Sequence, residues 1–488
     1  MKNLKKLTII HSNDLHGDFM AKEINDSLLG GVSRLSGYVQ KVRKEEKNVI
    51  YAIAGDMFRG SLIDSEYKGL STIEIMNLIS PDVVTLGNHE VDYGLAHLLF
   101  IEKCAKFPII NANMYVTVNH TRLFKSHHIF EIDGMNVLFI GILTEDVLAQ
   151  TKQDKLIGSL VDVEDAAKEV GKICNAYKTV DIDFTVLLTH IGIEADKKLA
   201  EKLDPRWGVD LIIGGHSHTY LEEPVEVAGI PIVQASSGTS YIGRLDIDVN
   251  TDNNCIDSYK WQLITINDEN CPRDKELESV ILKYKEVTDE KYQRILTRFV
   301  DCYTHPVRNT ETELGKIFAD AFKDTLGVDI MLLGSGGIRK EELGPIVTFQ
   351  DLVEVYPYKD VVYMLTLTGK QLRKIITYIL REDAFIGEHT EFFQFSRGLR
   401  IEYDRSNKML VSLSFNGYEV EDLEQFKVGV NGFHLNNIET SFGITLEEAS
   451  EIRKPKVVSS DCIDVIEEYF SRKKLIRVSS ENRLIIYQ

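Results

Sequence analysis

Five short polar motifs, each shortly after an apolar run, constrain the fold of this 488-residue chain most strongly. The runs span residues 7–10, 49–53, 83–86, 184–188 and 211–213, and each predicts a buried strand. Ligands of open α/β sheets gather at the edge where such strands end, so we predict an α/β fold with a polar site there. The motifs are Asp14-Leu-His16, Gly55-Asp56, Gly87-Asn-His-Glu90, Thr189-His190 and Gly215-His-Ser-His218.

These motifs offer more candidate metal ligands than one ion needs. One transition-metal ion takes about four to six ligands, some of them water in a catalytic site, so two divalent ions are the economical interpretation. A carboxylate is best suited to bridge two cations, and Asp56 stands alone at its strand end, which makes it the predicted bridge. Without thiolates the set admits manganese, zinc, iron or cobalt. The seven candidates are Asp14, His16, Asp56, Asn88, His190, His216 and His218.

Two such ions would favour phosphate ester chemistry. Two Asp charges against two dications leave an excess of about two positive charges, or about one with a bridging hydroxide, which suits a phosphate monoester. The ions would acidify a bridging water into a nucleophile, hold two phosphoryl oxygens and offset charge during in-line displacement. Each motif alone has an ordinary alternative, such as an N-cap, a turn or a core histidine. The order of all five along the chain favours the metal site.

The same series of motifs resembles the calcineurin-like metallophosphoesterases, and His11-Ser-Asn-Asp-Leu-His-Gly17 is similar to their 5'-nucleotidase branch. The resemblance implies a metallophosphoesterase-type α/β sandwich with mixed sheets. It also implies that His89 stabilises or protonates the leaving oxygen, and that Asp92 orients the His89 imidazole. Two ligand sets that share one residue are implied: Asp14, His16, Asp56 and His218 for one ion, and Asp56, Asn88, His190 and His216 for the other.

Length and periodicity predict two domains. A single core stops growing well below 488 residues, and strands alternate with helices, expected over 33–46 and 162–177, only to about residue 247. A charged, helix-periodic stretch over 274–300 predicts a connector. We predict a metallophosphoesterase domain at 1–270, a helical connector at 271–304, and a smaller α+β domain at 305–488. The last should begin with an amphipathic helix over 312–326 and a buried strand over 329–333.

The second half resembles the 5'-nucleotidase C-terminal domain. The landmarks are Arg308, the run from Gly334 to Arg339, and Tyr356-Pro-Tyr358, in that order. The resemblance implies that Arg308, Gly334 and Arg339 belong to the substrate site, where a guanidinium suits a phosphate or a ribose. It further implies that Tyr358 and Phe433 hold a nucleobase between their rings. From the residues alone, the favoured interpretation is that both are ordinary core or rim aromatics.

Three positions depart from the family pattern. Gly334 stands where Asn is usual, and Tyr358 stands where Phe is usual. Residues 436–439 replace a Gly-Gly-Asp stretch, so the ribose-binding acid is either absent or Glu439. Hydrolysis is therefore better supported than the identity of the nucleoside.

We predict a hydrolase that removes phosphate from nucleoside 5'-monophosphates. A 2',3'-cyclic nucleotide phosphodiesterase or a nucleotide-sugar pyrophosphatase is the nearest alternative, because the same metals can attack a diester. A general phosphatase with a structural second domain is another. A non-catalytic nucleotide-binding sensor should lack a ligand or His89, and neither is missing.

Charge and hydropathy restrict the classes of binding partner and the cellular compartment that we expect for this protein. The net charge of −19 argues against nucleic acid or an anionic membrane as a partner. The resemblance implies a small nucleotide as the partner. No apolar stretch approaches the length of a spanning helix, and residues 7–10 are too short for a signal peptide. Six scattered cysteines suit a reducing compartment. We therefore expect a cytoplasmic protein; the oligomeric state stays open.

Overall fold

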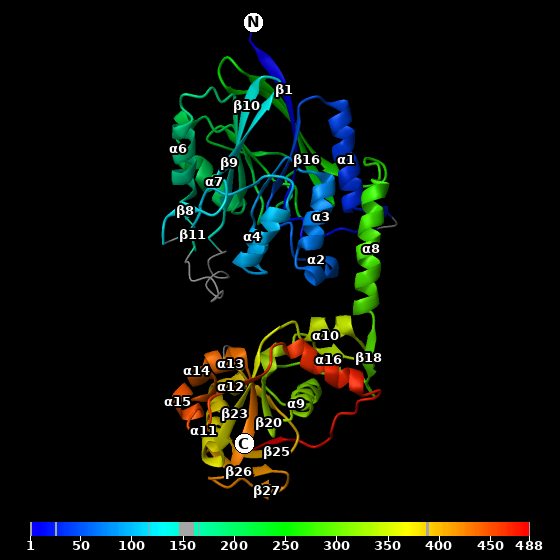
Figure 1. Cartoon of the computed structure of the whole chain (residues 1–488), viewed down its shortest axis with the longest axis vertical. Helices are drawn as coiled ribbons and strands as arrows, with labels where there is room; N and C mark the ends of the chain where they lie inside the picture. Colours follow the sequence, from blue (N-terminus) through cyan, green and yellow to red (C-terminus); the bar gives the residue numbers. More distant parts are fainter. Residues whose placement is uncertain are drawn as a thin grey trace. The chain divides into compact units, whose positions relative to one another are not determined.

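The computed structural model describes residues 2–24, 27–116, 118–145, 161–163, 165–386 and 390–487 (Figure 1). The chain forms two compact units, Met1–Thr288 and Asp289–Gln488. The boundary between them falls within helix α8 (Lys275–Tyr292), inside the stretch predicted as a connector. The predicted domain limits at 270 and 304 stay predictions.

Two six-stranded mixed sheets form the first unit. In the first sheet the strand order is β17 (Cys255–Thr265), β16 (Tyr241–Asn250), β1 (Leu4–Ser12), β4 (Val49–Ala54), β5 (Val83–Thr85) and β6 (Ile109–Ile110). In the second it is β14 (Val225–Val227), β15 (Ile230–Val233), β13 (Leu211–Ile213), β12 (Phe184–His190), β10 (Met135–Leu143) and β9 (His127–Ile132). All five predicted strands are thus present, and they are shared between the two sheets.

The two sheets pack face to face. One buried cluster joins Leu7 and Ile9 of β1 to Val137 of β10 and Val186 of β12. Alternate residues point to opposite faces of a strand, so Ile10 packs into a different cluster with the helices on the outer face. Strands covered on both faces are apolar at nearly every position, as the sequence runs indicated. The predicted α/β sandwich with mixed sheets is confirmed.

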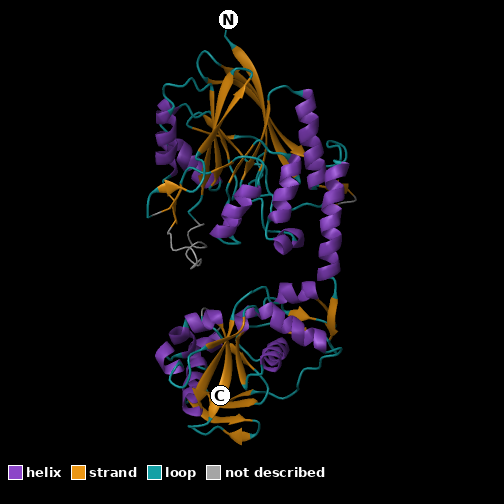
Figure 2. Ribbon diagram, in the orientation of Figure 1, coloured by secondary structure: helices purple, strands orange, loops and turns teal. Residues whose placement is uncertain are grey.

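Helices cover the outer faces of this sandwich, as the ribbon views show (Figures 1 and 2). Helices α1 (Val32–Glu45), α2 (Leu62–Tyr67), α3 (Leu70–Ile79) and α4 (Leu95–Cys104) pack on the first sheet. Helices α6 (Ala166–Ala176) and α7 (Ile193–Lys202) pack on the second. The helix predicted over 162–177 begins later than expected, because Val161–Val163 is strand β11, paired with β7 (Met114–Val116).

Parallel pairing brings the ends of the central strands to the same edge. Strand β4 pairs in parallel with both β1 and β5, and β12 pairs in parallel with both β10 and β13. The polar motifs leave from the carboxyl ends of β1, β4, β5, β12 and β13. The topology therefore delivers every predicted metal ligand to one edge of the sandwich.

The helix predicted over 274–300 is shorter in the structure than predicted. Helix α8 ends at Tyr292, and Ile295–Arg298 forms strand β18, which pairs with β22 (Ile346–Thr348). A strand partner some fifty residues further along the chain overrides the local helical periodicity of this segment.

The second unit is a smaller α+β structure. Its five-stranded sheet has the order β24 (Phe393–Phe395), β20 (Ile330–Gly334), β28 (Gln425–Asn431), β23 (Val362–Thr368) and β29 (Lys456–Ser459). A four-stranded sheet has the order β27 (Tyr418–Glu419), β26 (Met409–Phe415), β25 (Leu399–Asp404) and β30 (Leu484–Tyr487). The helices are α9 (Glu313–Leu326), α10 (Phe349–Val355), α11 (Gly369–Ile379), α12 (Glu382–Ile386), α13 (Gly432–Asn436), α14 (Ile438–Phe442), α15 (Leu446–Ala449) and α16 (Cys462–Arg472).

Helix α9 and strand β20 match the predicted start of this unit. Thr312 is the N-cap of α9, and its hydroxyl accepts a hydrogen bond from the Gly315 N–H at 3.1 Å. Within the described ranges, no helix has both the length and the apolar character required to cross a bilayer.

Candidate metal centre and substrate residues

The seven predicted metal ligands converge at the edge where the parallel strands end. Asp14 and Asp56 each lie two residues beyond a strand and are almost fully buried. His190 is the last residue of β12, and its ring is also buried. Three groups of ligand atoms each lie within 4.8 Å of one another: Asp14, His16 and His218; His16, Asp56 and His89; and Asp56, His190 and His216.

Short distances connect the members of this cluster. His190 Nε2 lies 3.1 Å from Asp56 Oδ2 and 3.9 Å from Asp14 Oδ1. His218 Nε2 lies 3.3 Å from Asp14 Oδ1 and 3.1 Å from His16 Nε2. His16 Nε2 is 4.0 Å from a carboxylate oxygen of each Asp. The seventh predicted ligand joins the cluster through a contact of 2.8 Å between Asn88 Oδ1 and His216 Nδ1.

The donor set fits divalent metal ions. The Nδ1 of His190 lies 2.7 Å from the Ala54 carbonyl oxygen. A hydrogen bond donated by Nδ1–H to that oxygen leaves the lone pair on Nε2 when the ring is neutral. That Nε2 is buried and has no hydrogen-bond partner among the residues described. Burial disfavours a charged His190, yet the Asp56 and Asp14 carboxylates outweigh burial and raise its pKa. Carboxylates that favour a proton on the buried His190 ring also favour a metal cation in the place of that proton, so the site is suited to a cation.

The backbone at these ligands is held in a rarely used conformation. Asp14, His16, Asp56, His216 and His218 all have positive φ, between 49° and 77°. Residues other than glycine adopt this region at an energetic cost, and such residues cluster at functional sites. The surrounding structure therefore fixes these five side chains in direction as well as in position.

His89 and Asp92 form the predicted pair beside the cluster. His89 Nδ1 lies 2.7 Å from Asp92 Oδ2, and the His89 ring centroid lies 5.3 Å from that of His16. The hydrogen bond to Asp92 is the largest influence on the pKa of His89 and raises it. Burial opposes the charge on Asp92, but its hydrogen bonds with His89 and Arg59 lower its pKa. The pair is thus arranged to stabilise a charged imidazolium.

Arg59 was not predicted from the sequence. Its guanidinium donates to the same Asp92 oxygen that contacts His89. Because 33 residues separate Arg59 from Asp92, no local pattern links the two. Glu90 is the last residue of the motif at 87–90, and its position beside Asn88 and His89 is a sequence signal for a role at this site.

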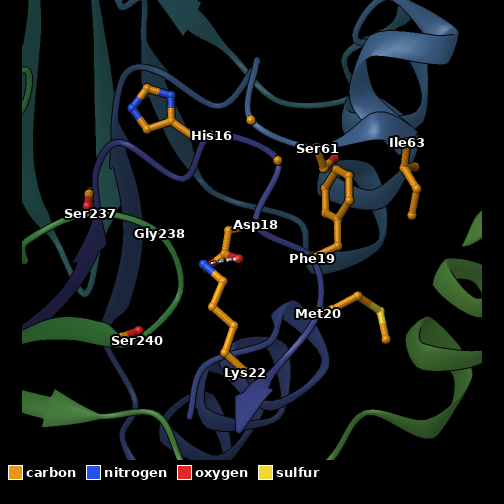
Figure 3. A pocket seen from close by; sticks show the side chains of 12 residues that line it. His16, Asp18, Phe19, Met20, Lys22, Ser61, Ile63, Ser237, Gly238 and Ser240 are labelled. Carbon is orange, nitrogen blue, oxygen red and sulfur yellow. Dashed lines mark ion pairs between the residues drawn. The ribbon is translucent and has the colours of Figure 1, made fainter. Parts of the chain in front are cut away.

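A cavity of about 530 Å³ opens beside His16 in the first unit (Figure 3). Asp18 and Lys22 form an ion pair of 2.9 Å within it. Its volume lies in the range of about 300–1,000 Å³ usual for ligand pockets, so it can hold part of an organic molecule. Apolar and hydroxyl side chains also line it: Phe19, Met20, Ile63, Ser61, Ser237 and Ser240.

In the second unit, two of the predicted substrate residues are in contact. The Arg339 guanidinium carbon lies 6.0 Å from the centroid of the Tyr358 ring. Tyr358 is 44% exposed and Phe433 is 63% exposed, which is unusual for large aromatic residues in a folded unit. No ring contact joins these two residues to each other within the described chain; Tyr358 contacts Tyr356, and Phe433 contacts His434.

Two other predicted substrate residues, Arg308 and Glu439, lie in different surroundings. Arg308 lies close enough to His305 and Glu391 to influence the pKa of each. Glu439 lies in the first turn of α14. Among the residues described, no hydrogen bond, ion pair or ring contact joins Glu439 to Tyr358 or Phe433.

Other side chains occupy the space that a side chain at position 334 would need. A Cβ at this position would overlap His434 Nε2 and would also contact the Glu391 carboxylate. Glu391 Oε1 accepts a hydrogen bond of 2.7 Å from the Gly336 N–H in the same glycine-rich run. His434 and Glu391 therefore fill the space beside residue 334 from elsewhere in the chain, and no local sequence signal marked either of them.

Comparisons with known proteins agree with both units. Residues 7–220 match the model of the calcineurin-like phosphoesterase family, and residues 288–443 match that of the 5'-nucleotidase C-terminal domain. A 5'-nucleotidase of Mus musculus is 26% identical, with 98% of this chain and 90% of that protein covered. A 5'-nucleotidase of Homo sapiens is 28% identical, with 83% of this chain and 76% of that protein covered.

Solved structures share the fold. The 5'-nucleotidase precursor of Thermus thermophilus superposes with a TM-score of 0.60 at 23% identity, covering 99% of this chain and all of that one. The NAD nucleotidase of Haemophilus influenzae superposes with a TM-score of 0.56 at 20% identity, over 99% of this chain and all of that one. Residues 7–220 therefore form a calcineurin-like phosphoesterase domain, and residues 288–443 form a 5'-nucleotidase C-terminal domain. Members of these families are metal-dependent hydrolases of phosphoric esters.

Proposed function

We propose that this protein removes phosphate from nucleoside 5'-monophosphates at a dinuclear metal centre. The observation that carries the proposal is the convergence of the seven ligand side chains around Asp14 and Asp56, with the His89–Asp92 pair beside them. Asp56 Oδ2 lies 3.1 Å from His190 Nε2 and 4.0 Å from His16 Nε2, one residue from each proposed ligand set, which supports Asp56 as the shared ligand. The C-terminal domain match and the names of the relatives support a nucleotide substrate.

The residues of this chain would have the following roles in metal binding and catalysis. Asp14, His16, Asp56 and His218 would hold one ion, and Asp56, Asn88, His190 and His216 the other. When bound, the ions supply an acidified water and positive charge that offsets the negative charge of the transition state. His89, oriented by Asp92, would donate a proton or a hydrogen bond from Nε2 to the leaving oxygen, because Nδ1 faces Asp92. In the second unit, Arg308 and Arg339 would bind phosphate or ribose oxygens.

A substrate panel tests the assignment. Purified protein with Mn²⁺ should release phosphate from AMP faster than it cleaves 2',3'-cyclic AMP or UDP-glucose. The cavity beside His16 has room for a second group on the phosphorus, which is why the diester and the pyrophosphate are included. Faster cleavage of either one would replace the proposed substrate class. Nucleotide binding without turnover would indicate a non-catalytic nucleotide sensor.

A cytoplasmic location stays a prediction, and cell fractionation tests it.

The exposed aromatics of the second unit provide a second test. Tyr358→Ala and Phe433→Ala are each expected to raise KM for AMP by roughly 5- to 150-fold, because stacking on a base contributes about 1–3 kcal/mol. Turnover of p-nitrophenyl phosphate, which has no nucleobase, should change little. Tyr418→Ala is the matched control, because Tyr418 is 80% exposed in the same unit and has no predicted role. An unchanged KM for AMP in both variants would mean that the second unit is structural.

A further inference from the structure

Glu90 has a buried carboxylate that binds two loops of the metal centre together. The residue is 1% exposed and lies in the short 3-10 helix Asn88–Val91. Its Oε1 accepts hydrogen bonds from the N–H groups of Met57 at 2.7 Å and Phe58 at 3.3 Å. Its Oε2 accepts from the N–H of Asp56 at 3.0 Å and from that of Gly87. Four backbone donors from two loops thus converge on one side chain.

These hydrogen bonds begin where the sheet ends. The last paired residues of β4 and β5 are Ala54 and Thr85, so beyond them the two segments are no longer joined by the hydrogen bonds of the sheet. Glu90 reconnects them at Asp56 and Gly87. A buried N–H without an acceptor costs about 1–3 kcal/mol, so the loops depend on this carboxylate.

The connection is reciprocal at Asp56. While Glu90 accepts from the Asp56 N–H, Asp56 Oδ1 accepts from the His89 N–H at 2.9 Å. Asp56 has a φ of 51°, a conformation that its surroundings must maintain. Gly87 is in such close contact that a Cβ there would overlap Asp56. The bridging carboxylate and the His89 backbone are therefore held in one unit with Glu90.

We propose that Glu90 is a positioning residue, which sets the direction of the Asp56 carboxylate and the place of His89 without binding metal or substrate itself. Both of its oxygens are engaged by backbone donors, so it has no role as a ligand. The expected effect of Glu90 on catalysis rests on the proposed function. The expected effect of Glu90 on metal affinity rests only on the geometry of the ligand cluster.

The test is a Mn²⁺ titration of Glu90→Gln by calorimetry, without substrate. The amide has the same shape but turns one acceptor into a donor, so two of the four N–H groups lose their acceptor. We expect Mn²⁺ affinity to fall roughly 10–100-fold, as for other groups that orient metal ligands. The kcat for AMP at saturating Mn²⁺ should also fall, with KM changed less. Glu90→Asp, which keeps both oxygens, should recover part of the Mn²⁺ affinity.

Asp210→Asn is the matched control. Asp210 also accepts a backbone hydrogen bond, from Thr185 N–H at 2.8 Å, and burial raises its pKa to about 7. Thr185 is five residues before His190 on β12, about 16 Å away along an extended strand. This variant should lower the melting temperature and leave Mn²⁺ affinity unchanged.

Three results would overturn the proposal. One is a Glu90→Gln protein that resembles Asp210→Asn, with lower stability and unchanged Mn²⁺ affinity. Another is a Glu90→Asp protein with no recovery of affinity over Glu90→Gln. The third is failure of both Glu90 variants to fold while Asp210→Asn folds, which would make Glu90 a residue of fold stability alone. Because the titration contains no nucleotide, its outcome is separate from that of the substrate panel.

Discussion

Asp56→Asn should lose tight binding of at least one metal ion and most of its turnover. The change keeps the size of the side chain but removes the charge that lies 3.1 Å from His190 Nε2. We expect kcat for AMP to fall by at least roughly 10²–10³-fold, the usual cost of losing one group that stabilises charge at an active site. Metal content by elemental analysis and a Mn²⁺ titration would measure the loss of binding directly.

Asp82→Asn is the comparison for this variant. Asp82 Oδ2 accepts from the Tyr51 N–H at 2.8 Å, and Asp82 precedes β5, at the strand end away from the ligands. Its replacement should lower stability and leave the metal content unchanged. If Asp56→Asn retained two ions per chain with wild-type affinity, Asp56 would not be the shared ligand.

His89→Asn should remove most catalysis while leaving metal binding intact. The loss of a positioned general acid costs roughly 10²–10⁴-fold in rate, and we expect a decrease of that size in kcat for AMP. The reason is geometric: the Nδ1 of His89 is 2.7 Å from Asp92, so the proton available to the leaving oxygen is on Nε2. Stopped assays of phosphate release from AMP, with metal content measured in parallel, would test this.

The leaving group separates proton donation from a merely structural effect. The p-nitrophenolate ion leaves readily without a proton, so His89→Asn should lose much less activity on p-nitrophenyl phosphate than on AMP. Asp92→Asn should show the same selectivity with a smaller loss, because Asp92 acts through the imidazole. An equal loss on both substrates would point to electrostatic stabilisation of the phosphoryl group in place of proton donation.

The candidate metal centre was predictable from the sequence because its predicted ligands follow local patterns. An apolar run predicts a strand, and the polar residue after it falls at the strand end. Parallel pairing of β4 with β1 and β5 then brings Asp14, Asp56 and Asn88 together without further information. The α9 helix was predictable for a similar reason, since its N-cap Thr312 and its amphipathic period lie within one short segment.

The sequence by itself thus determined the fold class and the groups that converge at the strand ends, because both depend on residues close together along the chain. Only the tertiary structure showed that Arg59 supports Asp92, that Glu90 binds the Asp56 loop, and that His434 fills the space at Gly334. It also decided that Ile295–Arg298 is a strand, through pairing with Ile346–Thr348. Each of these features is a contact between segments far apart in the sequence, and such contacts leave no periodicity in either segment alone.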